Sequence, residues 1–246
     1  MASPIKHLLF DLGGTLMHAK DERDDIFVQA DAALVNALRE YDIHLEATVF
    51  RKRLHDYYAQ RDKDLQETTY HFVLRELLKE LDYVEVAESV IRSGLDAMYA
   101  ITQANWQLEK DTLETLQALK SNQYHLGIYS NAGDDKDVQQ LIENFGIRKF
   151  FDFVLTSAAC FYRKPHPRAF EIALAQWNII PEEAVMIGDN LEADIKGAKQ
   201  VRMKTIWLTR RAKFTKEDMQ RIKPDFSMRK LTELLPTLDM ISMQRF

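Results

Sequence analysis

The stretch IKHLLFDLGGTL, residues 5–16, decides the fold. It is largely apolar over Ile5–Leu12, as expected for a central strand of a parallel sheet that is covered on both faces. Similar runs recur at Tyr124–Ser130, Phe151–Thr156, Ala184–Gly188 and Thr205–Thr209. Stretches with helical patterning lie between them at Lys110–Lys120, Asp135–Phe145, Pro167–Trp177 and Glu192–Val201. This alternation predicts an α/β fold built on a doubly wound parallel sheet.

Residues 20 to 105 interrupt the alternation, because they contain no strand-like run and their apolar residues fall at helical spacing. Four such stripes lie within Ile26–Leu38, Val49–Tyr58, Phe72–Leu81 and Val90–Tyr99. They predict a small all-helical bundle inserted after the first strand. We expect a core domain of residues 1–17 and 106–246, and a helical domain of residues 18–105. Short hinges are expected near Met17–Lys20 and Ala104–Leu108.

The composition is that of a globular enzyme rather than a nucleic-acid-binding or membrane protein. The net charge of the 246 residues is -5 and no basic block is present, which argues against nucleic acid as a partner. No apolar run approaches the roughly 20 residues of a membrane span, and the run before Asp11 is too short for a signal peptide. The one cysteine, Cys160, has no partner for an intramolecular disulfide. We expect a cytoplasmic protein; its oligomeric state is not indicated by the sequence.

Polar residues stand where the predicted strands end. Asp11 ends the first strand, Ser130 and Asn131 end the second, and Asp189 ends the fourth. Asp194 follows shortly after, and Lys164 comes from the loop after the third strand. Ligands of a parallel α/β sheet bind beyond the carboxyl ends of its strands, so these side chains are expected to converge there.

The convergent set suits phosphate chemistry. Three carboxylates would repel one another unless a hard cation joined them, and Mg²⁺ prefers such oxygen ligands. Lys164, Ser130 and backbone N–H groups around Gly13 and Gly14 could then hold the remaining phosphate oxygens. With its charge screened by the metal, Asp11 is a credible nucleophile. The sequence therefore predicts a Mg²⁺-dependent hydrolase of a small phosphorylated molecule.

Four motifs in order make the chain resemble the haloacid dehalogenase (HAD) superfamily, in its phosphatase form with a helical C1 cap. They are FDLGGTL at 10–16, YSN at 129–131, RKPHP at 163–167 and GDNLEAD at 188–194. The resemblance implies catalytic roles for Asp11 and Lys164, and substrate binding by Ser130, Asn131 and Gly14. It implies Mg²⁺ ligation by Asp11, Asp189, Asp194 and the backbone carbonyl of Gly13. Whether Asp194 ligates directly or supports Asp189 is left open.

Position 13 departs from the phosphatase pattern, in which a second Asp protonates the leaving group two residues after the nucleophile. Gly13 has no side chain, and a positioned acid/base contributes about 10²–10⁴-fold in rate. Another group could supply the proton, with His18, Asp21 and Glu22 as candidates. Alternatively, the substrate is an acyl phosphate or phosphoanhydride that needs no acid, or the chain is a weakly active or non-catalytic relative.

Other activities of the same superfamily stay open. A 2-haloacid dehalogenase uses the Asp nucleophile without metal, and the two acids of GDNLEAD argue against it. A phosphonatase would need a cap lysine, for which Lys20, Lys52 and Lys63 are available. Towards the C-terminus, Ile222–Leu235 resembles the closing strand and helix of the superfamily, and residues 237–246 are expected to form a loosely held tail.

Overall fold

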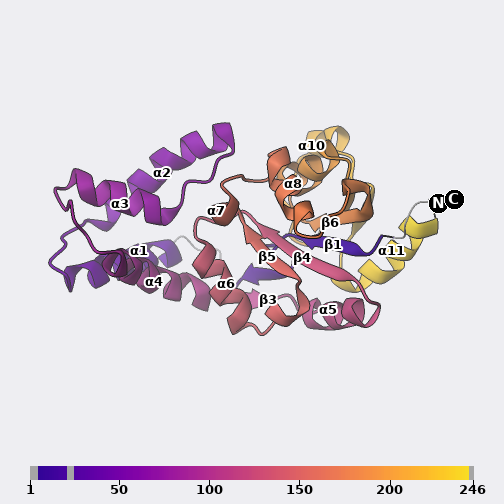
Figure 1. Cartoon of the computed structure of the whole chain (residues 1–246), viewed down its shortest axis with the longest axis horizontal. Coiled ribbons are helices and arrows are strands. Elements are labelled where there is room, and N and C mark those ends of the chain that lie inside the picture. The colour runs from indigo at the N-terminus through magenta and orange to yellow at the C-terminus, as the bar shows by residue number, and fades with distance from the viewer. Residues whose placement is uncertain (1–4, 21–24, 244–246) are drawn as a thin grey trace.

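The computed structural model describes residues 5–20 and 25–243, with Lys216 by its backbone alone. Within these residues six parallel strands form one sheet in the order β5-β4-β1-β6-β7-β8 (Figure 1). From one edge to the other they are Phe153–Thr156, His125–Ser130, His7–Phe10, Ala184–Gly188, Lys204–Leu208 and Phe226–Met228. The predicted doubly wound parallel sheet is therefore confirmed, with its first strand at the centre.

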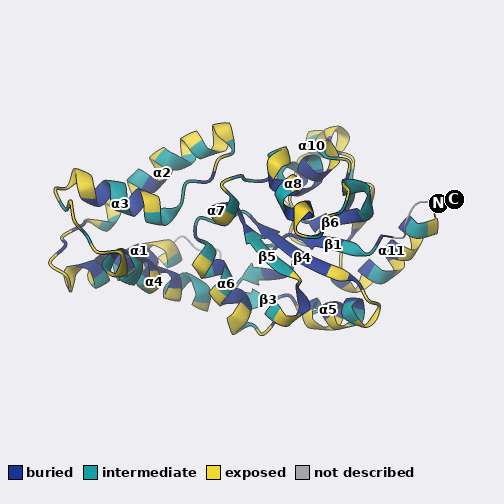
Figure 2. Ribbon diagram, viewed as in Figure 1, coloured by how far each residue is buried: buried dark blue, intermediate teal, exposed yellow. Residues whose placement is uncertain are grey.

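Both faces of the sheet are covered, which explains why its strands are so uniformly apolar. On β1, Leu8 and Phe10 pack into a core with the helices 112–121, 135–144 and 234–243. Leu9 packs with the helices 167–175 and 197–200 on the opposite face. Figure 2 shows the central strands as almost entirely buried. The helices of this part are α5 (Thr112–Ser121), α6 (Asp135–Asn144), α7 (Ser157–Cys160), α8 (Pro167–Ala175), α9 (Gly197–Gln200), α10 (Lys216–Arg221) and α11 (Leu234–Met243).

The four predicted helical stripes are four helices with a core of their own, which we call the helical unit. They are α1 (Asp25–Arg39), α2 (Ala47–Asp64), α3 (Tyr70–Glu80) and α4 (Glu88–Ala104). Leu34, Phe50 and Leu74 are fully buried in that core. In Figure 1 the unit lies to one side of the sheet, beyond α6 and α7. The exact boundaries of the two expected domains stay a prediction.

The connections between the helical unit and the sheet are short strands. β2 (Met17–Ala19) and β3 (Trp106–Leu108) pair antiparallel, with His18 opposite Gln107. The sequence predicted hinges at these positions and no strands, because three-residue, half-buried strands leave no periodic pattern. Their pairing brings the outgoing and returning chain together beside Asp11.

The prediction of a loosely held tail is wrong for residues 237–243, the part of it that the structure describes. Residues up to Met243 form α11, and its Leu238 and Ile241 are 2% exposed in the core on one face of the sheet. Residues 244–246 of that expectation lie outside the described residues. The helix continues past Pro236 because this proline falls in its first turn, where no intrahelical N–H donor is needed.

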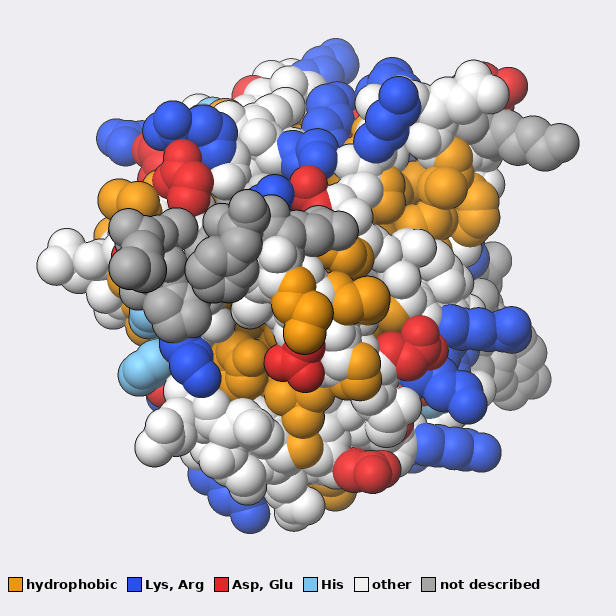
Figure 3. All heavy atoms as spheres, turned by 90° about the vertical axis from the view of Figure 1, so that its right-hand side faces the viewer, with side chains coloured by type: hydrophobic (Ala, Val, Ile, Leu, Met, Phe, Trp, Pro, Cys, Tyr) orange, Lys and Arg blue, Asp and Glu red, His pale blue; other side chains and the backbone are white. Residues whose placement is uncertain are grey.

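The surface mixes charges of both signs. On the face seen in Figure 3, Lys and Arg side chains lie beside Asp and Glu and between apolar groups. Among the described residues, the structure contains no helix that is long and apolar enough to cross a membrane.

Candidate active site

Asp11 stands directly after β1, at the carboxyl edge of the sheet. Its backbone N–H extends the ladder by donating to the carbonyl of Ile187 on β6 (2.9 Å), and its side chain is largely buried. The chain then turns back through Gly14, which has a φ of +81°. A Cβ at Gly14 would lie 2.4 Å from Oδ2 of Asp189, so only glycine fits here. The turn thus lets two carboxylates approach each other.

Three carboxylates gather at this edge. One oxygen each of Asp11, Asp189 and Asp194 lies within 4.8 Å of the others. Burial, and then the charges of the other two carboxylates, raise the pKa of Asp189 to about 8. Burial likewise raises the pKa of Asp194 to about 6, although Lys164 partly opposes it. Asp189 and Asp194 are therefore costly to ionise at this edge unless a cation joins the acidic group.

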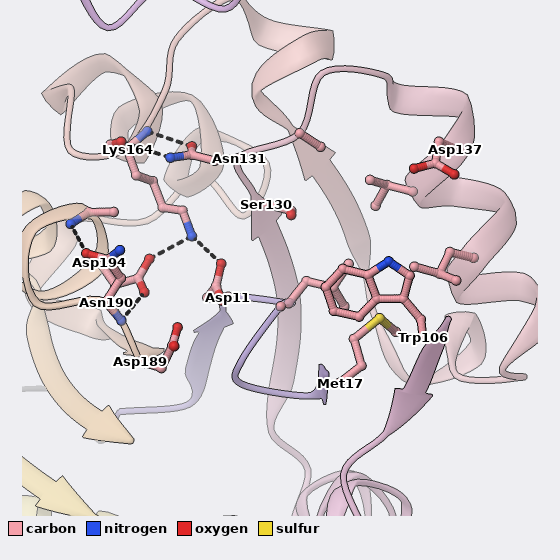
Figure 4. A pocket seen from close by; sticks show the side chains of 16 residues that line it. Asp11, Met17, Trp106, Ser130, Asn131, Asp137, Lys164, Asp189, Asn190 and Asp194 are labelled. Carbon is pink, nitrogen blue, oxygen red and sulfur yellow. Dashed lines mark hydrogen bonds and ion pairs between the residues drawn. The ribbon is translucent and has the colours of Figure 1, made fainter. Parts of the chain in front are cut away.

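Lys164 points into the acidic group from the opposite loop (Figure 4). Its Nζ lies 2.7 Å from Oδ1 of Asp11 and 2.7 Å from Oδ1 of Asp194, and the side chain is 1% exposed. Burial opposes its charge, yet the two carboxylates outweigh that cost and raise the pKa of Lys164. The ammonium is thus a fixed cation at the centre of the site.

Asn131 holds the loop that carries Lys164. Its Oδ1 accepts from the backbone N–H of Lys164 and its Nδ2 donates to the carbonyl of Lys164, both at 2.9 Å. Each polar end of this side chain thus makes one bond within the protein, and the role of Asn131 in substrate binding stays a prediction. The structure makes Asn131 a tie between two loops of the site.

The loop after β6 carries the other two acids. Asp194 lies in a π-helical turn, Leu191–Lys196, which begins at Asn190. Oδ2 of Asp194 accepts from the backbone N–H of Asn190 (3.1 Å). A Cβ at Gly188 would lie 2.2 Å from the same Oδ2, so the glycine of this motif makes room for the carboxylate. Such π-turns occur frequently at functional sites.

A cavity of about 250 Å³ opens beside Asp11. One end carries the three acids, Lys164 and the buried Ser130; the other end carries the apolar side chains of Met17, Trp106 and Leu141 together with the carboxyl group of Asp137. Figure 4 shows Lys164, Asp189 and Asp194 on one side of Asp11, and Met17 and Trp106 on the other. The cavity can therefore hold a charged group against Asp11 and a less polar group against the indole.

Gly13 and Gly14, whose backbone groups were predicted to contribute to the site, have different surroundings in the structure. The N–H of Gly14 donates to the carbonyl of Met17 (2.7 Å), so it is used within the turn and is not directed at a ligand. A Cβ at Gly13 would lie 3.2 Å from Cη2 of Trp106, whose ring stands over this position.

Of the substitute acids predicted from the sequence, His18 is described and Asp21 and Glu22 lie outside the described residues. Nδ1 of His18 lies 3.0 Å from a carboxylate oxygen of Glu109, and Nε2 lies 2.8 Å from Nε2 of Gln107. His18 lines a neighbouring cavity rather than the one beside Asp11. Its ring nitrogens are thus committed to contacts away from the nucleophile.

Two residues of the site were not predicted. Thr15 is fully buried and its Oγ1 donates to Oδ2 of Asp11 (3.2 Å). Thr15 lies within the first motif, four residues after Asp11, so the sequence offered a signal for placing it in the site. Trp106 lies 93 residues from Gly13 along the chain, and only the pairing of β3 with β2 brings it to the site.

Comparison with known proteins gives one consistent family. Residues 5–202 match the model of the haloacid dehalogenase-like hydrolases. Glyceraldehyde 3-phosphate phosphatase of Pyrococcus furiosus is 29% identical over 96% of this chain and 93% of its own. Pyrophosphatase PpaX of Bacillus thuringiensis is 28% identical over 95% of this chain and 96% of its own.

A solved structure, that of a HAD phosphatase from Thermococcus onnurineus, shares the fold with a TM-score of 0.63 and 25% identity, and covers 95% of this chain and 97% of that one. The match of the family model to most of the chain, together with the four motifs gathered at one sheet edge, decides the assignment. The chain belongs to the haloacid dehalogenase-like hydrolases and is an enzyme.

Proposed function

We propose that the protein is a Mg²⁺-dependent phosphatase of a small phosphorylated metabolite, with Asp11 as the nucleophile. The observation that supports it is the gathering of three carboxylates around one buried ammonium beside a cavity. The phosphatase names of similar proteins over nearly the whole chain support the same reaction class. We further propose that the helical unit acts as a cap over this site.

The donor set fits Mg²⁺. Asp11, Asp189 and Asp194 offer carboxylate oxygens within 4.8 Å of one another, and the carbonyl of Gly13 adjoins them along the chain. All are hard oxygen donors of the kind that Mg²⁺ prefers, and their shared negative charge calls for a cation. Bound there, Mg²⁺ would neutralise the oxygens of the phosphoryl group and screen the approaching carboxylate.

Both oxygens of Asp194 have contacts that would compete with metal ligation: Oδ1 contacts Lys164, and Oδ2 accepts from the N–H of Asn190. Direct ligation would require one of its oxygens to turn towards the metal. In the arrangement described, Asp194 fixes Lys164 and the loop after Asp189. The sequence left two roles open for Asp194, direct ligation of Mg²⁺ and support of Asp189. Both keep Asp194 in the metal site, and only direct ligation requires one of its oxygens to give up a present contact for the metal.

The remaining residues have separable tasks. Thr15 and Lys164 fix the two oxygens of Asp11 and orient the carboxylate for attack. An oxygen of Asp11 would form a bond to phosphorus as the bond to the ester oxygen breaks. Water would then attack phosphorus and break the bond to Asp11, which releases phosphate. Ser130 and the charge of Lys164 are the donors available to the phosphoryl oxygens.

A phosphoanhydride is the second candidate substrate class, favoured by a second cavity of about 310 Å³. It shares Gly13, Trp106 and Asp189 with the first cavity and is also lined by Arg211 and Lys213. Cationic side chains suit an anionic leaving group. A phosphate leaves without a proton donor far more readily than an alkoxide, which agrees with the missing side chain at position 13.

The first experiment is a panel of phosphorylated metabolites and inorganic pyrophosphate, assayed for phosphate release with and without Mg²⁺. We expect release that depends on Mg²⁺ and falls at least about 10³-fold in Asp11→Asn, since the nucleophile is lost. Release unaffected by Asp11→Asn would refute the proposed nucleophile. Halide release from 2-haloacids without metal would favour the dehalogenase alternative.

The second experiment separates the two substrate classes. Lys213→Met should raise KM for pyrophosphate by about tenfold and leave KM for p-nitrophenyl phosphate unchanged, because only pyrophosphate carries a second anionic group. Lys79→Met, which removes an exposed cation paired with Glu76 on α3, is the matched control. Equal changes for both substrates would contradict an anionic subsite in the second cavity.

A further inference from the structure

The segment between α2 and α3 is hydrogen-bonded to the loop that leads to Lys164. The N–H of Arg163 donates to the carbonyl of Leu65 (2.9 Å), and the N–H of Glu67 donates to the carbonyl of Phe161 (2.8 Å). An antiparallel bridge joins the residues between them. The helical unit is therefore attached to the α/β part at a third place, in addition to β2 and β3.

The side chain of Glu67 is buried at this third attachment. It is fully covered, and its Oε2 accepts from Oγ of Ser157 and from Nη1 of Arg163. Its Oε1 lies 3.6 Å from Nη1 of Arg61, which belongs to α2. The fully covered carboxylate of Glu67 is thus paired with two guanidinium groups whose side chains are only 14% and 15% exposed, at the boundary between the two parts of the chain.

Glu67 reaches both loops that carry ligand-facing residues. Arg163 directly precedes Lys164. Oγ of Ser157 accepts from the N–H of Ala132 (2.9 Å), two residues after Ser130. The carboxylate of Glu67 therefore contacts the Lys164 loop directly, through Arg163, and the Ser130 loop indirectly, through Ser157. Asn131 also joins these two loops to each other.

A neighbouring contact strengthens the same attachment. The N–H of Tyr70, at the start of α3, donates to the carbonyl of Gly133 (3.0 Å). A Cβ at Gly133 would lie 2.6 Å from the ring of Tyr70, so the ring packs directly on the backbone after Ser130. The helical unit thus contacts the Ser130 loop through both main chain and side chain.

We infer that Glu67 is a positioning residue: through Arg163 and Ser157 it ties the helical unit to the loops that carry Lys164 and Ser130, and it holds both loops in place. Removing the carboxylate of Glu67 would leave the largely buried guanidinium of Arg163 without its partner, so a variant at this position should loosen the attachment. The kinetic part of this inference rests on the proposed phosphatase function. The structural part, the coupling of the helical unit to both loops, does not.

Glu67→Gln is the principal variant, because the amide keeps an acceptor for Ser157 and loses the charge that pairs with Arg163. Glu67→Ala removes both contacts. Glu80→Gln is the control: Glu80 also pairs with an arginine, Arg53, but both residues lie within the helical unit. All three proteins are compared with the wild-type chain at full length.

The first readout is backbone amide exchange, which does not depend on activity. We expect faster exchange at Arg163, Glu67, Tyr70 and Ala132 in Glu67→Gln, and faster still in Glu67→Ala, with β1 and β6 unchanged. Glu80→Gln should leave the four amides at wild-type rates. Unchanged exchange at Arg163 and Ala132 in Glu67→Gln would overturn the inference.

The second readout is kinetic, with the phosphate substrate that the panel identifies. Glu67→Gln should lower kcat about tenfold or more, because a misplaced Lys164 no longer orients Asp11. A purely structural role would lower the unfolding temperature and leave kcat per folded molecule unchanged, which would overturn the positioning role. If wild-type enzyme releases no phosphate, the proposed function fails and the exchange experiment still decides the coupling.

Discussion

At position 13 the chain carries no side chain, and the indole of Trp106 stands where one would project. A Cβ there would lie 3.2 Å from Cη2 and 3.6 Å from Cζ3 of the ring. The backbone of Gly13 does not adopt the left-handed φ that favours glycine, unlike that of Gly14. The obstacle to an aspartate at this position is therefore the ring and not the main chain.

This arrangement predicts that Gly13→Asp needs a second change to act as a general acid. Alone, it should raise kcat/KM for alkyl phosphates by less than about tenfold. Combined with Trp106→Phe, which removes the outer ring, it should gain about 10²-fold, the lower end of the usual contribution of a positioned acid. Steady-state kinetics with Trp106→Phe as control checks this. A 10²-fold gain from Gly13→Asp alone would show both that Trp106 does not obstruct it and that no substitute acid operates.

Asp137 on α6 is a carboxylate held in an unfavourable environment beside the cavity. Burial, reinforced by Asp134, raises its pKa to about 6, although the side chain of Gln103 donates to it (2.8 Å). The unfolded chain ionises this group near its ordinary pKa of 3.8. Folding stability is therefore lost as the pH rises from about 4 to 6, and the loss stays constant above that range.

Asp137→Asn should remove this cost and keep an oxygen that accepts from Gln103. We expect the free energy of unfolding at pH 7.5 to rise by about 1–3 kcal/mol, since one pKa unit corresponds to about 1.4 kcal/mol. The gain should shrink towards zero near pH 4, where the carboxyl is neutral in both states. Urea unfolding at several pH values measures it, with Glu143→Gln on the exposed side of α6 as control. A variant less stable than wild type at pH 7.5 would contradict the argument.

Among the elements, α11 shows how a local signal can mislead. A loosely held tail was expected for residues 237–246 because terminal residues are often poorly ordered, yet the helix runs through Pro236, which lies in its first turn, where a helix accepts proline. Leu238→Ala should lower the free energy of unfolding by about 2–4 kcal/mol, because this side chain is 2% exposed in the core. Met240→Ala, on the 49% exposed side, should change it by less than about 0.5 kcal/mol. Equal effects in denaturant unfolding would mean that α11 does not pack as described.

Elements that are buried on both faces could be predicted from the sequence, and elements defined by pairing could not. β1 and β6 are continuous apolar runs because each of their faces meets helices. β2 and β3 are three residues long and half-buried, and only their pairing with each other makes them strands. The stretch 192–201 reads as one helix, whereas a π-turn occupies its first half and carries Asp194, which contacts Lys164.

At the scale of the whole molecule, the site is predictable where the sheet alone assembles it. Asp11, Ser130 and Asp189 follow neighbouring strands, so the strand order brings them to one edge. Trp106 and Glu67 depend instead on how the helical unit meets the sheet. Glu67 lies 96 residues from its partner Arg163, and neither residue belongs to a periodic pattern that would indicate the contact.

The same organisation predicts where Mg²⁺ stabilises the protein. A ligand that binds only the folded state at 100 times its Kd adds about 2.7 kcal/mol, which for a chain of this size raises the unfolding temperature by about 5–10 °C. All three acids lie on the α/β part, so the shift belongs to the unfolding of the sheet, whether or not the helical unit unfolds with it. Differential scanning calorimetry with and without Mg²⁺ measures it. Asp189→Asn should abolish the shift, whereas Asp137→Asn, which changes a carboxylate outside the acidic group, should keep it. A full shift in Asp189→Asn would place the metal elsewhere.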